Sequence, residues 1–305
     1  MLSVLLTAHN EGAEVARTVR SIARNTRSPH EIILVDDAST DGSCSRLAGF
    51  RVRIVRHQRR IGVAPSRVAA AKLARGDVLA FLDAHQRVSR GCLDACADRA
   101  IAQQAIVWPD VRGFDRESRT LHGASFRLCR TRGYFTARWN LRQPKAKVSP
   151  VSSVRCPGYV MPRAVYEHVR WIKGLRNWGA SEAAVSLKAF FLDIPILHLC
   201  GPVAKHLFKR RLQYDATWED VWRNQAIIAR VCFAERTWRD YWLPSVFAPH
   251  LSQATLREID SRSVQRQHDQ FQRIKVRDDS EFWTSLLRKP VPCGNVPIAA
   301  GDSAN

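Results

Sequence analysis

The feature that most constrains the fold is a regular alternation of short apolar runs with segments of helical character. The apolar runs are typical of buried strands, and the segments between several of them have apolar or alanine-rich patterns that favour helices. The predicted strands are 2–7, 31–35, 52–55, 78–82 and 105–108, and the predicted helices are 12–25, 64–74 and 91–103. Strands that alternate with helices at this spacing indicate right-handed crossovers between parallel strands. The sequence therefore predicts an α/β fold, with a mostly parallel sheet flanked by helices.

The alternation weakens beyond residue 113. Residues 113–157 are rich in arginine and aromatic residues, and they predict loops and short antiparallel pieces. Residues 182–192 predict an amphipathic helix. We expect 194–199 to form an edge strand, because Pro195 has no N–H to donate to a sheet.

The last part of the chain predicts helices and a tail. A helix with four tryptophans is expected over 217–242, and an arginine-rich polar helix over 250–277. A flexible tail is expected from Lys289, where proline and glycine become frequent. We therefore predict one large domain over 1–245, followed by an arginine-rich helical extension and flexible tail over 246–305.

A carboxylate and an imidazole follow the predicted strand 78–82. At strand spacing, Asp83 and His85 point to the same side, and they lie at the carboxyl end of the strand, where open α/β sheets bind ligands. One oxygen ligand and one nitrogen ligand suit a divalent cation, and the mixed pair fits Mn²⁺ better than Mg²⁺. The alternative is a helix-capping aspartate beside an incidental histidine.

Two more polar clusters follow predicted strands, one at Thr7 and one at Asp37. The carboxyl ends of parallel strands converge on one edge of a sheet, so these residues would meet Asp83 there. An acid after the second strand can bond a base or a ribose, and a metal after the fourth can neutralise a diphosphate. No GxGxxG or GxxxxGK[ST] pattern occurs, which argues against a dinucleotide oxidoreductase and a P-loop NTPase.

Composition adds constraints on partners and compartment. The 305 residues include 48 lysines and arginines against 28 acids, a net charge of +20, which attracts polyanions or anionic small substrates. No apolar run is long enough for a transmembrane helix, so no stable membrane insertion is expected. The first residues do not resemble a signal peptide, and the eight cysteines contain no CxxC pair. We therefore expect reduced thiols and a cytoplasmic location.

The ordered set of motifs resembles the catalytic domain of polypeptide N-acetylgalactosaminyltransferases, which are metal-dependent GT-A enzymes close to the family 2 glycosyltransferases. The segments that carry this resemblance are Thr7-Ala8-His9-Asn10-Glu11, Ile33-Leu34-Val35-Asp36-Asp37-Ala38-Ser39, Arg59-Arg60-Ile61-Gly62, Phe81-Leu82-Asp83-Ala84-His85, Pro157-Gly158-Tyr159-Val160-Met161, Trp178-Gly179-Ala180-Ser181-Glu182 and Lys205-His206-Leu207-Phe208-Lys209. The resemblance covers roughly residues 2–242 and implies a GT-A fold without the lectin domain of the animal enzymes. It also implies transfer of a hexosyl or N-acetylhexosaminyl group from a UDP-sugar, with retention of anomeric configuration.

The resemblance further implies a role for each matching residue. Thr7 and Asp37 would contact the uridine, and Arg60 and Arg67 would line the nucleotide or phosphate side. Asp83, His85 and His206 would bind Mn²⁺ or another divalent cation, Lys209 would add to the stabilisation of the leaving UDP, Glu182 would lie near the reacting sugar, and Trp178 would form a wall of the site.

Three departures from the family pattern bear on the donor. Ser181 stands where the family has glutamate, so the acid is shifted by one position to Glu182. Lys209 replaces an arginine, which turns a bidentate phosphate contact into a point charge. Pro157 replaces a glycine near the sugar. Trp178 has the alternative of being a buried core residue.

The acceptor is open to three interpretations. The high positive charge and the arginines interleaved with aromatics favour a hydroxymethylated base in DNA, as in phage-type DNA modification, with the aromatic rings stacking on the base. The alternative is O-glycosylation of serine or threonine in a polypeptide, as the resemblance implies. A non-catalytic polyanion-binding protein is the third, and the intact metal-ligand set argues against it. The transferred sugar and the oligomeric state are left open.

Overall fold

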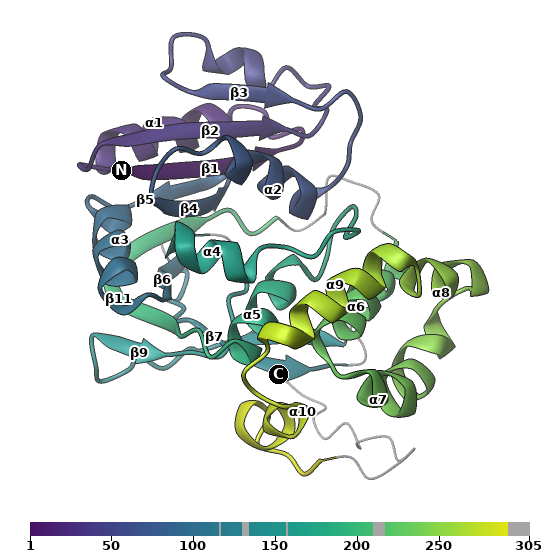
Figure 1. Ribbon diagram of the computed structural model, residues 1–305. Helices are drawn as coiled ribbons and strands as arrows, with labels where there is room; N and C mark the ends of the chain where they lie inside the picture. Colours follow the sequence, from purple (N-terminus) through teal and green to yellow (C-terminus); the bar gives the residue numbers. More distant parts are fainter. Residues whose placement is uncertain (116, 130–133, 157, 210–216, 292–305) are drawn as a thin grey trace.

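A computed structural model of the chain describes residues 1–115, 117–129, 134–156, 158–209 and 217–291 (Figure 1). Its strands are β1 Leu2–Ala8, β2 His30–Asp36, β3 Arg53–Arg56, β4 Val78–Asp83, β5 Gln86–Val88, β6 Ile106–Gly113, β7 Ala124–Leu128, β8 Phe135–Trp139, β9 Val148–Pro150, β10 Tyr159–Pro162 and β11 Ile196–His206. Its α-helices are α1 Glu14–Asn25, α2 Val63–Leu73, α3 Cys92–Gln103, α4 Arg163–Val169, α5 Ser181–Phe191, α6 Trp218–Cys232, α7 Glu235–Thr237, α8 Gln253–Ile259, α9 Arg262–Ile274 and α10 Asp279–Glu281. Short 3-10 helices span Cys44–Leu47 (η1) and Ala248–His250 (η4), and π-helices span Trp238–Phe247 (η3) and Phe282–Leu286 (η5).

The central sheet runs in the order β3-β2-β1-β4-β10-β6-β11-β5, with β9 paired to β11. The first four strands in this order are parallel, and β10 enters antiparallel between β4 and β6. Residues 113–157 contribute the antiparallel pair β7–β8 and the short strand β9, as the weak pattern there predicted. The predicted α/β class with a mostly parallel, helix-flanked sheet is confirmed.

The two faces of the sheet are covered by different helices. Alternate residues of a strand face opposite sides. Thus Leu5 and Phe81 pack into the core that α2, α4 and α5 share, whereas Val4 and Leu82 pack into the core under α1 and α3. Figure 1 shows α2 and α4 in front of the sheet. Burial on both faces leaves the strand ends as the positions where polar side chains can gather.

The prediction of an edge strand at 194–199 was wrong. Pro195 lies just before β11, and its carbonyl accepts a hydrogen bond from the amide of Ile106. The strand itself pairs with β6 on one side and with β9 and β5 on the other. A register shift between Leu199 and Val203 interrupts its pairing with β6. The strand is longer than predicted and ends at His206, so it delivers this side chain to the carboxyl edge of β4.

The helix predicted over 217–242 is broken after Cys232. Phe233 adopts an extended backbone and is fully buried against the rings of Trp242 and Phe282. Burial of an aromatic ring outweighs the loss of one helical turn here. Of the four tryptophans in the segment, Trp222, Trp238 and Trp242 are buried and Trp218 is 61% exposed. The three buried rings belong to the core and cannot stack on a base.

The arginine-rich helix predicted over 250–277 consists of two helices, α8 and α9, because Ser261 has an extended backbone between them. Phe271 of α9 packs on Phe191, and Trp283 of η5 stacks on Trp242. The predicted division at residue 245 stays a prediction. The tail prediction falls in part on 292–305, which lie outside the described residues.

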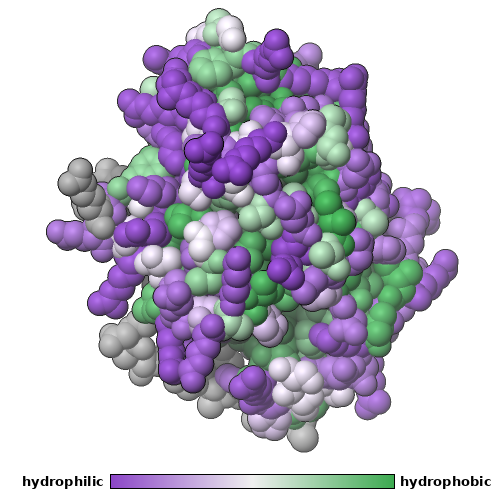
Figure 2. Space-filling model, turned by 90° about the vertical axis from the view of Figure 1, so that its left-hand side faces the viewer, coloured by the Kyte–Doolittle hydropathy of each residue, from purple (hydrophilic) through white to green (hydrophobic). Residues whose placement is uncertain are grey.

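Within the described ranges, no helix is both long and apolar enough to span a lipid bilayer. The seven described cysteines are all free thiols. Figure 2 views the molecule from the left side of Figure 1 and shows hydrophilic side chains over most of that face, with small apolar patches between them.

Candidate active site

A cavity of about 290 Å³ lies at the carboxyl ends of β1, β2 and β4, beside the end of β11. Nine of the ten residues predicted for the site line it: Thr7, Asp37, Arg67, Asp83, His85, Trp178, Glu182, His206 and Lys209. Among the described residues, Arg60 is the predicted site residue that does not line this cavity. We call this space the site cavity.

Asp83, His85 and His206 converge at one wall of the site cavity. Nε2 of His206 lies 3.2 Å from Oδ2 of Asp83, and Nε2 of His85 lies 3.9 Å from the same oxygen. The two imidazole rings are 4.9 Å apart, centroid to centroid. His85 reaches this position through a turn after β4 rather than by strand alternation. One carboxylate oxygen and two imidazole nitrogens facing one point form a donor set that suits Mn²⁺ or a similar divalent cation.

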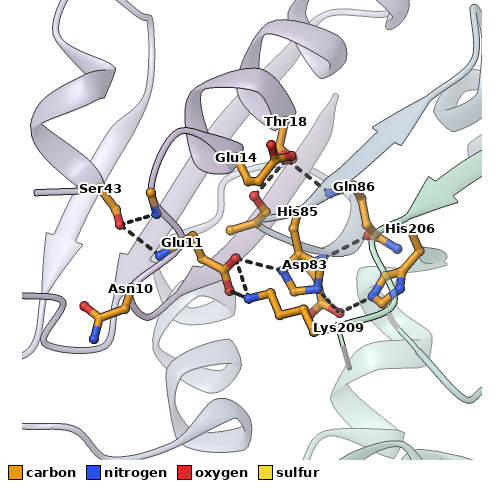
Figure 3. Close-up of polar contacts among 12 residues, drawn as sticks. Asn10, Glu11, Glu14, Thr18, Ser43, Asp83, His85, Gln86, His206 and Lys209 are labelled. Atoms are coloured by element: carbon orange, nitrogen blue, oxygen red, sulfur yellow. Dashed lines mark hydrogen bonds and ion pairs between the residues drawn. The ribbon is translucent and has the colours of Figure 1, made fainter. Parts of the chain in front are cut away.

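Glu11 holds this group from the other side. Its carboxylate lies 3.0 Å from Nδ1 of His85 and accepts hydrogen bonds of 2.8 and 2.7 Å from Nζ of Lys209 (Figure 3). A carboxylate on Nδ1 fixes the ring and leaves Nε2 free to face Asp83, which is the usual support of a metal-binding histidine. Burial favours the neutral acid, but His85 and Lys209 together hold the pKa of Glu11 below its usual range.

Arg67 lies between the two acids of the site. This guanidinium is only 3% exposed, forms an ion pair with Glu182, and lies 3.4 Å from Oδ1 of Asp83. Burial opposes its charge, but Glu182 and Asp83 together raise the pKa of Arg67 above its usual range. Burial likewise opposes the charge of Asp83, whereas His206, His85 and Arg67 lower its pKa. Asp83 is therefore ionised at neutral pH, as a metal ligand requires.

Asp37 organises one end of the site cavity. Both of its oxygens accept backbone hydrogen bonds of 2.8 Å, from the amides of Ile61 and Gly62. Gly62 has a φ of 101°, and a β-carbon there would lie 2.4 Å from the backbone nitrogen of Asn177. Glycine is therefore required at this contact. Asp37 thus anchors the loop before α2, and both Asp37 and Thr7 line the cavity.

Ten further residues line the site cavity without having been assigned a role from the sequence: Ala8, His9, Glu11, Val63, Ser66, Arg155, Cys156, Ser181, Leu207 and Phe208. Glu11 and Phe208 lie inside motifs that the sequence singled out, so their position was a usable signal. Ser181 donates to Glu182 and lies 3.3 Å from Arg67, so it supports the ion pair. Trp178 is 38% exposed at the cavity rim, which excludes the alternative of a buried core tryptophan.

A second group of potential ligands lies in the interior, at Asp110, His122 and His198. Nδ1 of His122 and Nε2 of His198 lie 2.7 and 2.8 Å from the same oxygen of Asp110. The other carboxylate oxygen accepts from the amide of Gly201, at the register shift of β11. These are hydrogen-bond distances, and the group ties β11 to β6.

The fold and the position of the site cavity define the class of protein: a GT-A-type α/β fold with its site at the carboxyl edge of the parallel strands. A family model described as glycosyl transferase family 2 matches residues 3–168, more than half of the chain. The chain therefore belongs to this family of glycosyltransferases.

Individual relatives are polypeptide N-acetylgalactosaminyltransferases. The chain is 30% identical over 282 residues to polypeptide N-acetylgalactosaminyltransferase 8 of Drosophila melanogaster, an alignment that covers 82% of the chain and 46% of the relative. It is 27% identical over 232 residues to human polypeptide N-acetylgalactosaminyltransferase 14, covering 70% and 41% respectively. The chain thus spans less than half the length of these relatives.

Solved structures share the fold. A crystal structure of GalNAc-T7 with UDP, GalNAc and Mn²⁺ superposes with a TM-score of 0.63 at 21% identity, covering 88% of the chain and 56% of that structure. A structure of TarS from S. aureus in complex with UDP-GlcNAc has a TM-score of 0.53 at 17% identity, covering 75% and 65%. These likenesses establish the GT-A fold.

Proposed function

We propose that the chain transfers an N-acetylhexosamine from a UDP-sugar to a serine or threonine hydroxyl of a polypeptide, with a divalent cation as cofactor. The observation that carries this proposal is the convergence of Asp83, His85 and His206 in the cavity that Thr7 also lines. The relatives named above support a polypeptide acceptor. A polypeptide acceptor therefore replaces the hydroxymethylated DNA base that the charge of the sequence favoured, because no relative described above is named for DNA.

The donor set fits a divalent cation such as Mn²⁺. Both imidazole Nε2 atoms face the carboxylate of Asp83, and Glu11 occupies Nδ1 of His85, so the free nitrogen of that ring points toward the cation position. When bound, such a cation supplies charge neutralisation for the leaving diphosphate. Asp83, His85 and His206 would hold the cation, and Glu11 would orient the ring of His85.

The remaining residues would either bind the donor or stabilise the charge of the leaving diphosphate. Thr7 would contact the uridine, and Asp37 would hold the loop that closes this end of the cavity. Lys209 would add positive charge beside the diphosphate while Glu11 positions its ammonium group. Trp178 would cover the sugar at the cavity rim, where its ring is partly exposed. Retention of configuration is part of this proposal, by attack of the acceptor on the face that the diphosphate leaves.

Glu182 would act on the donor sugar through its fixed orientation. Arg67 and Ser181 hold its two carboxylate oxygens, so its position is set from the protein side. A carboxylate held this way can accept hydrogen bonds from sugar hydroxyls. The shift of this acid by one position relative to the family pattern therefore still leaves an acid facing the cavity.

The test is mass spectrometry of three acceptors mixed with the chain, Mn²⁺ and a panel of UDP-sugars. The acceptors are a peptide rich in serine and threonine, the same peptide with alanine at those positions, and hydroxymethylated DNA. The proposal predicts the mass of one N-acetylhexosamine on the first peptide alone, lost when the metal is chelated. A mass shift on the DNA and none on the peptide would overturn the polypeptide acceptor.

A further inference from the structure

A groove beside the site cavity is lined by four arginines, Arg127, Arg138, Arg142 and Arg155. It has a volume of about 840 Å³, and no aspartate or glutamate lines it among the residues that the structure describes. We call it the arginine groove. A cleft of this size is on the scale of pockets that hold a ligand or a short chain segment.

Two of these arginines lie on the same face of the hairpin β7–β8. Ser125 of β7 pairs with Arg138 of β8, and Arg127 lies two residues along β7 from Ser125. Residues two apart on a strand face the same side, so Arg127 and Arg138 share one face of the hairpin. Arg142 follows β8, and Arg155 follows β9, which completes the lining from two further segments.

Three of the four arginines of the groove have no acidic partner in the part of the chain that the structure describes. In the described ranges, no carboxylate forms an ion pair with Arg127, Arg138 or Arg142, whereas most of the buried arginines elsewhere have acidic partners. Nε of Arg127 is buried and has no hydrogen-bond partner. A concave surface lined by one sign of charge concentrates ligands of the opposite sign.

The arginine groove and the site cavity share a lining residue. Arg155 lines both spaces, and its guanidinium lies 5.1 Å from the ring centre of Trp139. The ring of Trp139 in turn meets the edge of Phe208, which lines the site cavity. The two spaces are therefore adjacent, on either side of Arg155 and the contact between Trp139 and Phe208.

We infer that the acceptor is an acidic polypeptide segment, with aspartate or glutamate side chains near the modified serine or threonine, which binds in the arginine groove. This inference rests on the proposed function and specifies the acceptor of that same site. The groove also offers apolar contacts at Trp139 and Leu141, which suit a segment of mixed side chains. Carboxylates of such a segment would supply acidic partners, which Arg127, Arg138 and Arg142 lack among the described residues, in the bidentate geometry that a guanidinium favours.

The experiment uses three peptides of equal length, each with one threonine flanked by aspartate, asparagine or lysine. Two readouts are taken with the full chain: transfer from the UDP-sugar, and binding of labelled peptide by fluorescence anisotropy. At low salt the aspartate peptide is expected to bind about tenfold more tightly than its asparagine counterpart, and its kcat/KM for transfer is expected to be about tenfold higher. Both ratios, of affinity and of kcat/KM, are expected to fall toward one in about 0.5 M NaCl.

The variant Arg138→Glu/Arg142→Glu is expected to abolish the preference for the aspartate peptide in both readouts. The matched control is Arg24→Glu/Arg51→Glu, which makes the same change in net charge at exposed arginines that line neither the site cavity nor the arginine groove. Circular dichroism checks the folding of both variants. Equal binding of the three peptides by the wild-type chain, or an unchanged preference in the groove variant, would overturn the inference. Failure of the proposed function looks different: no peptide is modified, while the difference in binding persists.

Discussion

Removal of the charge on Glu11 is expected to weaken metal binding without any change to a metal ligand. The carboxylate contacts Nδ1 of His85 at 3.0 Å and Nζ of Lys209 at 2.7 Å, and its side chain is 9% exposed. Hydrogen bonds to charged groups contribute about 1.5–3 kcal/mol each when they are protected from water. Loss of an outer partner of a metal-binding histidine costs about 10–100-fold in metal affinity. We therefore expect Glu11→Gln to raise the Kd for Mn²⁺ about tenfold and Glu11→Ala about 100-fold.

The assay is calorimetric titration of Mn²⁺ into the chain in the presence of UDP. Glutamine retains an acceptor for His85 but loses the charge that faces Lys209, which is why its effect should be the smaller of the two. Glu14→Gln serves as the control, because Glu14 pairs with Arg17 and Arg87 and does not line the site cavity. An unchanged Mn²⁺ affinity in Glu11→Ala, or an equal loss in Glu14→Gln, would refute the role assigned to Glu11.

Three other perturbations follow from the same structure. Asp83→Asn should abolish Mn²⁺-dependent release of UDP while the far-ultraviolet circular dichroism stays unchanged; retained turnover would contradict its role as a ligand. Gly62→Ala should lower the free energy of unfolding by about 2 kcal/mol or more, and weaken UDP binding in a fluorescence titration, because its φ is 101° and the new β-carbon would meet the backbone of Asn177. Burial lowers the pKa of Lys188 from 10.5 to about 8, so the unfolded chain binds more protons between these values and stability rises with pH there. The substitution Lys188→Met removes this buried charge together with the hydrogen bond that Nζ donates to the carbonyl of Arg170. The net effect should be a stabilisation of about 2 kcal/mol at pH 7 and a flatter pH dependence of stability in denaturant titrations. A destabilised variant would contradict this expectation.

The N-terminal half of the fold could be predicted because local signals and long-range packing agree there. The apolar run before Asp83 is a strand buried on both faces, and the helices on either side of it supply the crossovers. Parallel neighbours then bring Thr7 and Asp83 into register, so two predicted site residues share one sheet edge. Each of these steps depends on strand and helix signals that can be read within short segments of the sequence.

The sequence was less informative where tertiary packing decides. Pro195 suggested an edge strand, but it lies one residue before β11 and costs the central strand no hydrogen bond. Phe233 interrupts a helical pattern because burial of its ring in the core stabilises the fold more than one further helical turn would. The pair Glu11–Lys209 joins the ends of β1 and β11, and no local pattern indicates that these ends meet. The lining of the arginine groove comes from separate segments in the same way.

The most direct test of the central claim is anomalous diffraction from crystals grown with UDP and Mn²⁺. We predict a manganese peak between Oδ2 of Asp83 and the Nε2 atoms of His85 and His206, within about 2.0–2.3 Å of each, as nitrogen and oxygen ligands of divalent transition metals require. A peak at Asp110, His122 and His198 with none at the site cavity, or no peak at either group, would contradict the account.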